Sequence, residues 1–186
     1  MIRILFSKKR ILSSGFLICF LFINQSASAQ LHPLAKESGV NFTIHNFGFK
    51  TGGKLDPPEG DIVFNPDNLP GSYFKMTIKS ASINTDNDSR DEHLRADTYF
   101  DVKNYPLIYF VSENIQATNK KGAYIVVGKL AIKNKSEEIS IPFTAEKNGN
   151  GWLFSGSFNM NRRDFDIGGS STISNALTVD IKVLAK

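Results

Sequence analysis

The sequence ISIPFTAEKNGNGWLFSGSFNM, residues 139–160, contains two runs of alternating apolar and polar side chains separated by a short turn. Such alternation is typical of a β-strand, whose successive side chains point to opposite faces of a sheet. The Asn148-Gly149-Asn150-Gly151 turn is the strongest hairpin signal in the chain, since Asn and Gly accept the positive φ angles that tight turns need. The stretch predicts two antiparallel strands, and Pro142 indicates an edge or a bulge in the first of them.

Six further runs are predicted to be strands, of which five have the two-residue period and one, Leu107 to Val111, is continuously apolar. In the first, the phase slips by one residue so that Phe47 and Phe49 continue the apolar row, which predicts a bulge near Asn46. Gly52-Gly53 and Pro57-Pro58 are interpreted as turns, and residues 30–36 as an unstructured lead-in. The six runs are centred on Val40 to Ile44, Ile62 to Phe64, Phe74 to Ser80, Leu107 to Val111, Tyr124 to Ile132 and Leu177 to Val183.

Eight strands at hairpin spacing, with few segments long and periodic enough for helices, predict an all-β antiparallel fold. Eight is the number of strands in the smallest common up-and-down barrel, whose interior either fills with side chains or holds one slender ligand. A sandwich of two sheets is the alternative that the pattern leaves open. The continuous apolar run Leu107 to Val111 predicts a strand covered on both faces.

One short helix is predicted between the third and fourth strands, within Ser89 to Asp101. Ser89 followed three residues later by Glu92 has the form of a capping box. Leu94, with Tyr99 and Phe100, gives the segment an apolar side that can lie against a core.

The first 29 residues read as a secretory signal peptide. A basic head is followed by the apolar run Ile11 to Ile23, too short for an ordinary membrane span, and by the cleavage pattern Ala27-Ser28-Ala29. We expect cleavage after Ala29, a periplasmic or secreted protein without an integral membrane anchor, and one folded domain over residues 30–186. Cys19 lies in this leader, so residues 30–186 contain no cysteine for a disulfide or a thiolate site.

The charge balance depends on the leader. Four of the 22 Lys and Arg residues lie in it, and the rest equal the 18 Asp and Glu residues in number. Residues 30–186 therefore lack the net basic excess expected of a protein that binds nucleic acid or an anionic membrane surface through its overall charge. Motifs for phosphate-binding loops, dinucleotide binding and zinc proteases are absent from the sequence, and its three histidines lack ligand spacing. No cofactor and no metal are expected.

Two charged clusters are candidates for a polar site. In the first, Arg90 offers a rigid fork of donors, Asp91 a carboxylate and His93 a group that titrates near neutrality. These residues either clamp a ligand head group or act as an acid and base pair, or else they hold a helix in place at a barrel end. The second cluster contains Arg162 and Asp164, and Arg162 or Arg163 is a candidate partner for an acid of the first cluster. Its simplest interpretation is a latch that closes one end of the fold.

The inward phases of the strands are rich in Phe and Met, which in a small barrel either fill the core or line an apolar tunnel for an unbranched or isoprenoid chain. Small inward residues such as Gly128 and Gly156 favour the tunnel. The predicted lining residues are Phe42, Ile44, Phe64, Phe74, Met76, Ile78, Phe110, Val126, Phe143, Phe154, Phe158 and Met160.

Several segments form a recognisable pattern: R-D-E-H-L at 90–94, Y-F-D at 99–101, Y-P at 105–106 with Ile108 and Phe110, G-K-L at 128–130 with Ile132, and Arg162, Asp164 and Phe165 with Ile167-Gly168. Over about Glu37 to Lys186 this pattern resembles the YceI-like family, exported bacterial proteins with a lipocalin-like barrel that bind polyisoprenoid or related long-chain amphiphiles. Two departures are Glu37-Ser38, where the family has a His-Ser pair, and Asp166, where it usually has Gly.

The resemblance implies a non-enzymatic carrier that holds a long-chain isoprenoid, quinone-like or fatty amphiphile for transport, storage or buffering. Two other functions remain open: an enzyme acting on such a lipid through Arg90, Asp91 and His93, or a filled barrel that binds a protein partner on its surface. A homodimer is left open as an assembly state.

Overall fold

The computed structural model describes residues 29–169 and 172–186. Within them the chain forms ten strands and one α-helix, with four short 3-10 helices. The strands are β1 (Gln30–Leu31), β2 (Gly39–Asn46), β3 (Phe49–Leu55), β4 (Glu59–Val63), β5 (Tyr73–Lys79), β6 (Leu107–Ala117), β7 (Ala123–Ile132), β8 (Lys135–Asn148), β9 (Gly151–Asn161) and β10 (Ile173–Ala185). The helices are η1 (Ala35–Glu37), η2 (Leu69–Gly71), η3 (Ser80–Ser82), α1 (Asp88–Arg95) and η4 (Arg162–Phe165).

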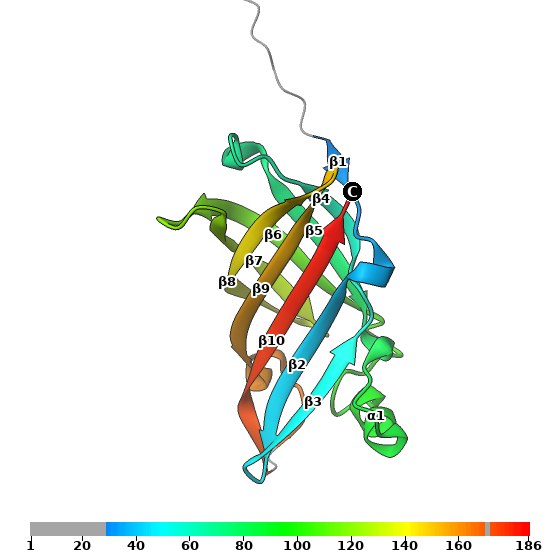
Figure 1. Cartoon of the computed structure of the whole chain (residues 1–186). Coiled ribbons are helices and arrows are strands. Elements are labelled where there is room, and N and C mark those ends of the chain that lie inside the picture. The colour runs from blue at the N-terminus through cyan, green and yellow to red at the C-terminus, as the bar shows by residue number, and fades with distance from the viewer. Residues whose placement is uncertain (1–28, 170–171) are drawn as a thin grey trace, which may run out of the picture.

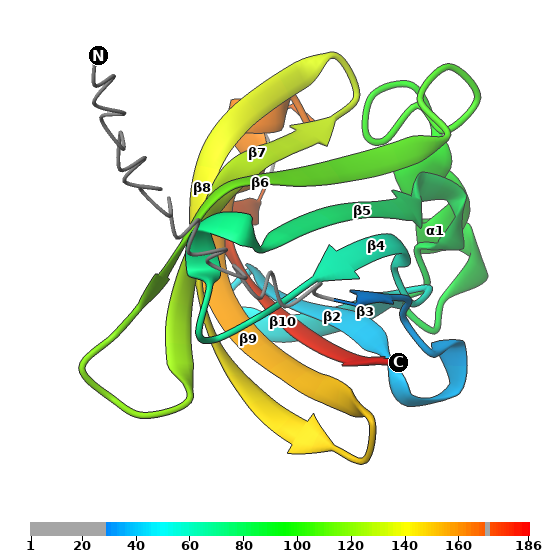
Figure 2. The same ribbon diagram turned by 90° about the horizontal axis from the view of Figure 1, so that it is seen from above.

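All ten strands belong to one antiparallel sheet in the order β1-β4-β5-β6-β7-β8-β9-β10-β2-β3. The sheet is strongly curled, and β9, β10, β2 and β3 lie across an interior from β5, β6 and β7 (Figure 1; Figure 2). The all-β antiparallel prediction is confirmed. The predicted strand count of eight is wrong, since the described residues form ten strands with β1 and β3 at the edges.

Short backbone contacts hold each edge of the curled sheet to a neighbouring segment. Beyond β1, the His32 N–H donates to the Lys186 carbonyl at 2.9 Å and the Lys186 N–H donates to the His32 carbonyl at 3.1 Å. On the other edge, the Lys54 N–H of β3 donates to the Asn84 carbonyl at 2.8 Å, and the Asn84 N–H returns a bond at 2.9 Å. These bridges hold β3 beside the segment that leads into α1.

The extra strands come from segments that the sequence pattern misassigned. The phase slip near Asn46 is a two-residue hairpin turn and not a bulge, because Asn46 pairs with Phe49 and β3 runs back along β2. Gly52-Gly53, predicted as a turn, lies inside β3. The lead-in contains β1, which pairs with β4, and η1. Residues 1–28 of the predicted leader lie outside the described residues.

The single helix is confirmed, but the predicted capping box is wrong. Asn87 caps α1, since its side chain accepts a 2.9 Å hydrogen bond from the Arg90 N–H. Ser89 is an exposed residue of the first turn. Asn and Ser have similar preferences for the cap position, so residue preference alone does not distinguish the two.

Of two expectations about single strands, one is wrong and one agrees with the structure. The prediction that β6 is covered on both faces is wrong, because Tyr109 and Val111 on its outer face are 47% and 44% exposed. Pro142 pairs with Ile125 of β7, whereas the pairing of β8 with β9 begins only at Phe143. Pro142 therefore lies at a local edge of the sheet, where a residue without an N–H is best tolerated.

The inward row of β7 shows how alternation builds the core. Tyr124, Val126, Leu130 and Ile132 are all buried, as their period predicts. Each such side chain contributes roughly 1.5–3 kcal/mol when fully buried. Gly128 interrupts the row, because a Cβ there would lie only 2.9 Å from the Phe110 ring and 2.4 Å from the Val111 carbonyl oxygen. Gly128 therefore makes room for Phe110 and not for a ligand.

Candidate functional site

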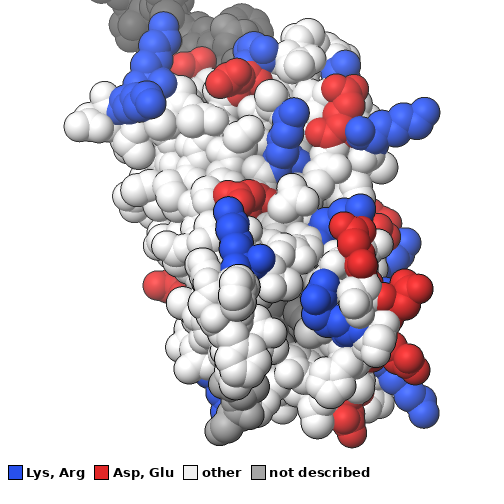
Figure 3. Space-filling view, turned by 60° about the horizontal axis from the view of Figure 1, so that its bottom comes forward, with Lys and Arg blue, Asp and Glu red and all other residues white. Residues whose placement is uncertain are grey.

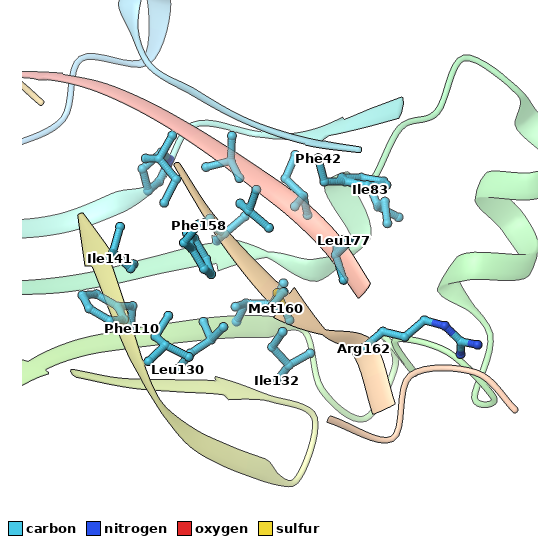
Figure 4. Close-up of a pocket in the computed structure, with 18 of the residues that line it drawn as sticks. Phe42, Ile83, Phe110, Leu130, Ile132, Ile141, Phe158, Met160, Arg162 and Leu177 are labelled. Atoms are coloured by element: carbon cyan, nitrogen blue, oxygen red, sulfur yellow. The ribbon is translucent and has the colours of Figure 1, made fainter. Parts of the chain in front are cut away.

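The interior of the curled sheet contains a cavity of about 280 Å³. Its walls are almost entirely apolar and come from all strands from β2 to β10. Figure 4 shows some of these side chains, among them Phe110, Phe158 and Leu177, around the interior. A cavity of about 150 Å³ with such walls in another protein stays dry and binds benzene. This interior is large enough and apolar enough to exclude water in favour of hydrocarbon.

Eleven of the twelve predicted lining residues line this cavity, while their role in lipid binding stays a prediction. They are Phe42, Ile44, Phe74, Met76, Ile78, Phe110, Val126, Phe143, Phe154, Phe158 and Met160.

Phe64 is the exception, because it lies in a packed aromatic cluster and not on the cavity wall. Its ring contacts those of Trp152 at 5.1 Å, Tyr124 at 5.2 Å and Phe154 at 5.3 Å between centroids, each nearly edge to face. Edge-to-face pairs of this kind add stability beyond the burial of their area. The cluster fills the interior beyond Phe143 and Phe154, so the cavity occupies only part of the curled sheet.

Two glycines lie at or near the wall of the cavity, where a side chain would take up space. Gly156 lines the cavity, as its inward phase predicts. A Cβ on Gly53 would lie 2.3 Å from the Phe42 ring, so the glycine lets this ring lie flat against β3.

The cavity reaches the edge of the sheet between β3 and the segment before α1. A surface groove there shares Phe42, Thr51, Thr85 and Arg90 with the cavity wall. Polar and charged residues dominate the rest of the groove, including Lys50, Lys54, Asn84 and Asp86. The apolar interior and the polar groove are therefore neighbours that share part of their lining, an arrangement that suits a molecule with a long apolar chain and a polar head.

The first charged cluster is held together by Thr85. The Thr85 N–H and hydroxyl donate to one Asp91 carboxylate oxygen at 2.9 and 2.5 Å. The Arg90 guanidinium donates to the Thr85 hydroxyl and carbonyl oxygens, each at 2.7 Å. Asp91 is buried, whereas Arg90 and the nearby His93 are exposed, and the His93 ring contacts Tyr99 at 4.9 Å between centroids. These contacts fix α1 to the loop before it.

The second charged cluster is organised around Arg162, which is 5% exposed. Its guanidinium donates to the carbonyl oxygens of Ile167 at 2.6 Å and Ser174 at 3.0 Å, and thereby holds the connection between η4 and β10. Burial lowers the pKa of Arg162, since a buried site disfavours the charged form, and neighbouring Arg163 lowers it further while Tyr99 raises it. Figure 4 shows the guanidinium pointing away from the apolar side chains.

The contacts that the described residues make with Arg162 and Arg163 include none with an acid of the first cluster, contrary to the pairing that the sequence suggested. Asp164 is exposed on η4, and the Arg162 contacts described above are to main-chain carbonyls and not to an acid of α1. The segments meet instead through the Gly168 N–H, which donates to the Thr98 carbonyl at 2.9 Å. Lys133 adds bonds to the Asp97 and Asp166 carbonyls at 3.2 and 3.4 Å. We call these contacts between residues 97–98, 133 and 166–168 the end latch.

Several cavity residues fell outside the predicted set. Leu177, Val179, Ile181 and Val183 of β10 line the cavity, and their alternation was the signal that identified them as inward-facing. Leu94 and Phe100 also line it, as the apolar side of the helical segment could have shown. Ile83 and Thr85 precede the helix without any periodic pattern, so no sequence signal marked them.

Within residues 29–169 and 172–186, no group of three or more His, Cys, Asp and Glu side chains is placed to hold a metal ion. None of the helices in these residues has the length and apolar character needed to cross a membrane. Figure 3 shows acidic and basic side chains interspersed on the face that carries the lower end of Figure 1, without a broad patch of one sign.

Residues 31–185 match the family model of the YceI-like domain. A UPF0312 protein of Pseudomonas savastanoi pv. phaseolicola is 30% identical over 149 residues, which cover 76% of this chain and 77% of the relative. A UPF0312 protein of Photorhabdus laumondii is 26% identical over 129 residues, covering 69% and 66%.

Solved structures have the same fold. BcnA of Burkholderia cenocepacia superposes with a TM-score of 0.78 at 25% identity, over 83% of this chain and 99% of that one. A polyisoprenoid binding domain from Saccharophagus degradans, implicated in plant cell wall breakdown, superposes with a TM-score of 0.69 at 14% identity, over 86% and 99%. The family match spans nearly all of the described residues, and the chain therefore belongs to the YceI-like domain family.

Proposed function

We propose that this protein is an exported, non-enzymatic binding protein that holds the chain of an isoprenoid, quinone-like or fatty amphiphile for transport, storage or buffering. The observation that carries the proposal is the apolar cavity of about 280 Å³ inside the curled sheet. Removing a long hydrocarbon chain from water into such walls is favourable by about 25 cal/mol per Å² of apolar surface. The polyisoprenoid binding domain from Saccharophagus degradans, which has the same fold, supports a ligand of this class.

The polar groove beside the cavity gives the ligand an orientation. The apolar chain lies between the rows of β5 to β10, and the head group lies in the groove beside Arg90, Lys50 and Lys54. Thr85 and Asn84 offer further hydrogen-bonding atoms there. A ligand with a polar or anionic head therefore fits better than a plain hydrocarbon.

The hydrogen bonds within the first charged cluster agree better with a binding function than with catalysis. Asp91 is buried and accepts two hydrogen bonds from Thr85, and Arg90 donates two to the same residue. These bonds use the Asp91 carboxylate and the Arg90 guanidinium to hold the polypeptide in place before α1.

Export to the periplasm or beyond is proposed from the predicted leader. The intact mass of the purified protein tests it, since cleavage after Ala29 removes residues 1–29.

Extraction of the purified protein with organic solvent, followed by mass spectrometry, tests the binding proposal directly. We expect a long-chain amphiphile in the extract, and uptake of such a lipid by protein that has been stripped. A clean extract together with no uptake of isoprenoid or fatty chains would contradict the proposal.

A cavity-filling variant locates the ligand. Leu177→Trp places a large ring among the cavity-lining side chains, so we expect binding of a fluorescent fatty acid to weaken by roughly tenfold or more, which is about 1.4 kcal/mol. Ala176→Trp adds the same ring to the neighbouring exposed position and is the matched control. Equal binding by both variants would place the ligand elsewhere.

A further inference from the structure

The tip of the β2–β3 hairpin, residues 46–49, exposes two phenylalanines. Phe47 and Phe49 are 72% and 78% exposed, more than any other large hydrophobic residue in the part of the chain that the structure describes. Their exposure places two aromatic rings in water at a single turn. Exposed apolar clusters of this kind mark sites that contact another apolar phase or partner.

The hairpin tip lies at the rim of the cavity. Asn46 and Thr51 both line the cavity, and the residues between them in the chain extend past its wall. Phe49 pairs directly with Asn46, so the two side chains share one face of the sheet, the face that bounds the cavity. Phe49 therefore continues the cavity-facing row of β3 beyond the point where the cavity ends.

The fold itself gains little from a phenylalanine at the turn. Phe47 has a φ of 49° and Gly48 a φ of 81°, the positive pair found in two-residue hairpin turns. Asn or Gly suits the first of these positions, whereas a bulky aromatic residue there is a conformational outlier. Since Phe47 is also largely exposed, its packing does not offset this cost.

The charge of the hairpin favours a lipid surface over other partners. Residues 39–55 contain Lys50 and Lys54 and no acidic residue. Lys50 is exposed and directly follows Phe49. Aromatic side chains prefer the boundary between hydrocarbon and water, and adjacent lysines attract lipid phosphates.

We propose that the hairpin tip inserts Phe47 and Phe49 into the surface of a lipid bilayer, so that the rim of the cavity meets the membrane where an amphiphile enters or leaves. The role given to this docking, lipid entry or release, rests on the proposed function. Whether the tip binds a bilayer is measured separately. Lys50 faces the phosphate layer while the two rings lie among the upper acyl chains.

The test uses vesicles of equal parts phosphatidylcholine and phosphatidylglycerol. In Phe47→Asn/Phe49→Thr the new residues suit the turn and the strand, so we expect the melting temperature to stay equal or rise. Vesicle binding in co-sedimentation should fall by roughly tenfold or more, because two buried rings are lost from the bilayer. The matched control is Tyr109→Thr/Val111→Thr, which removes two exposed apolar side chains from the outer face of β6 and should leave vesicle binding unchanged. Intact mass must show that residues 1–29 are absent, since an apolar leader would bind vesicles itself.

Binding of a soluble fluorescent fatty acid separates the two proposals. We expect the hairpin variant to bind it as the unmodified protein does, while taking up lipid from vesicles more slowly. Fatty-acid binding without any vesicle binding would overturn the docking proposal alone, and vesicle binding without fatty-acid binding would overturn the proposed function alone. If the hairpin variant instead binds vesicles normally and only changes from dimer to monomer in light scattering, the tip is a contact between two copies of the chain and the docking proposal is wrong.

Discussion

Thr85 connects the loop before α1 to the charged residues of the helix. Its hydroxyl donates to Asp91 and accepts from Arg90, and its main chain bonds to both residues. Because Asp91 is buried, its carboxylate needs these donors, and the donors in turn need the carboxylate. Arg90 and Asp91, whose role the sequence left open between a polar site and a structural one, thus form a hydrogen-bonded network with Thr85.

Replacing Asp91 tests this structural role. Asp91→Ala leaves the buried N–H and hydroxyl of Thr85 without their acceptor, so we expect a loss of about 2 kcal/mol or more in the free energy of unfolding. Urea denaturation followed by circular dichroism measures the loss. Glu92→Ala, at the next position and exposed, should stay within about 0.5 kcal/mol. Unchanged stability with a lost chemical activity on a lipid would instead assign Asp91 to catalysis.

At the scale of elements, α1 and η4 are short segments that are stabilised mainly by what they contact. The end latch joins the loop after α1 to the connection after η4 through Gly168, Thr98 and Lys133.

Asp166 has a φ of 52°, a left-handed conformation that Gly accepts most readily and Asp tolerates. Its carboxylate lies 3.3 Å from Lys135, an interaction that a Gly at this position could not make.

The start of α1 gives a prediction about an element. Asn87→Ala removes the side-chain acceptor of the Arg90 N–H and should cost about 1 kcal/mol. Ser89→Ala, which would break the capping box expected from the sequence, should change stability by no more than about 0.5 kcal/mol, since Ser89 is exposed inside the helix. Thermal melts of both variants measure the difference, and the reverse order of effects would show that the helix starts at Ser89.

At the scale of the whole molecule, the interior of the curled sheet is packed with side chains at one end and contains the cavity at the other. The aromatic cluster around Phe64 fills the interior near Trp152, whereas the cavity extends toward α1 and the polar groove. If the proposed function holds, a ligand chain enters from the side of the polar groove and reaches no deeper than the aromatic cluster.

This asymmetry predicts how affinity depends on the ligand. Each added methylene should strengthen binding by about fourfold, or 0.8 kcal/mol, until the chain reaches the aromatic cluster, after which affinity should level off. Raising the salt concentration should leave the gain in affinity per methylene nearly unchanged, since burial and not charge drives that increment. Titration calorimetry of a series of fatty acids of increasing length measures both effects. An affinity that is independent of chain length would contradict binding inside the sheet.

Much of the fold could be predicted because strand alternation is a local property of the chain. The inward rows of β5, β7, β8, β9 and β10 follow from period two alone, since neighbouring side chains on a strand must point to opposite faces. The phase slip at Phe47 was visible too, but a bulge and a two-residue turn shift the phase alike. Only the pairing of Asn46 with Phe49 distinguishes them.

The sequence by itself therefore determined an antiparallel all-β chain, one short helix and the identity of most inward-facing residues. Only the tertiary structure decided that Phe64 packs among rings while Phe158 borders a cavity, and that Arg162 bonds to carbonyl groups. The physical reason is that alternation fixes the face on which a side chain lies. Whether that face meets another ring, empty space or a polar atom depends on strands far away in the sequence.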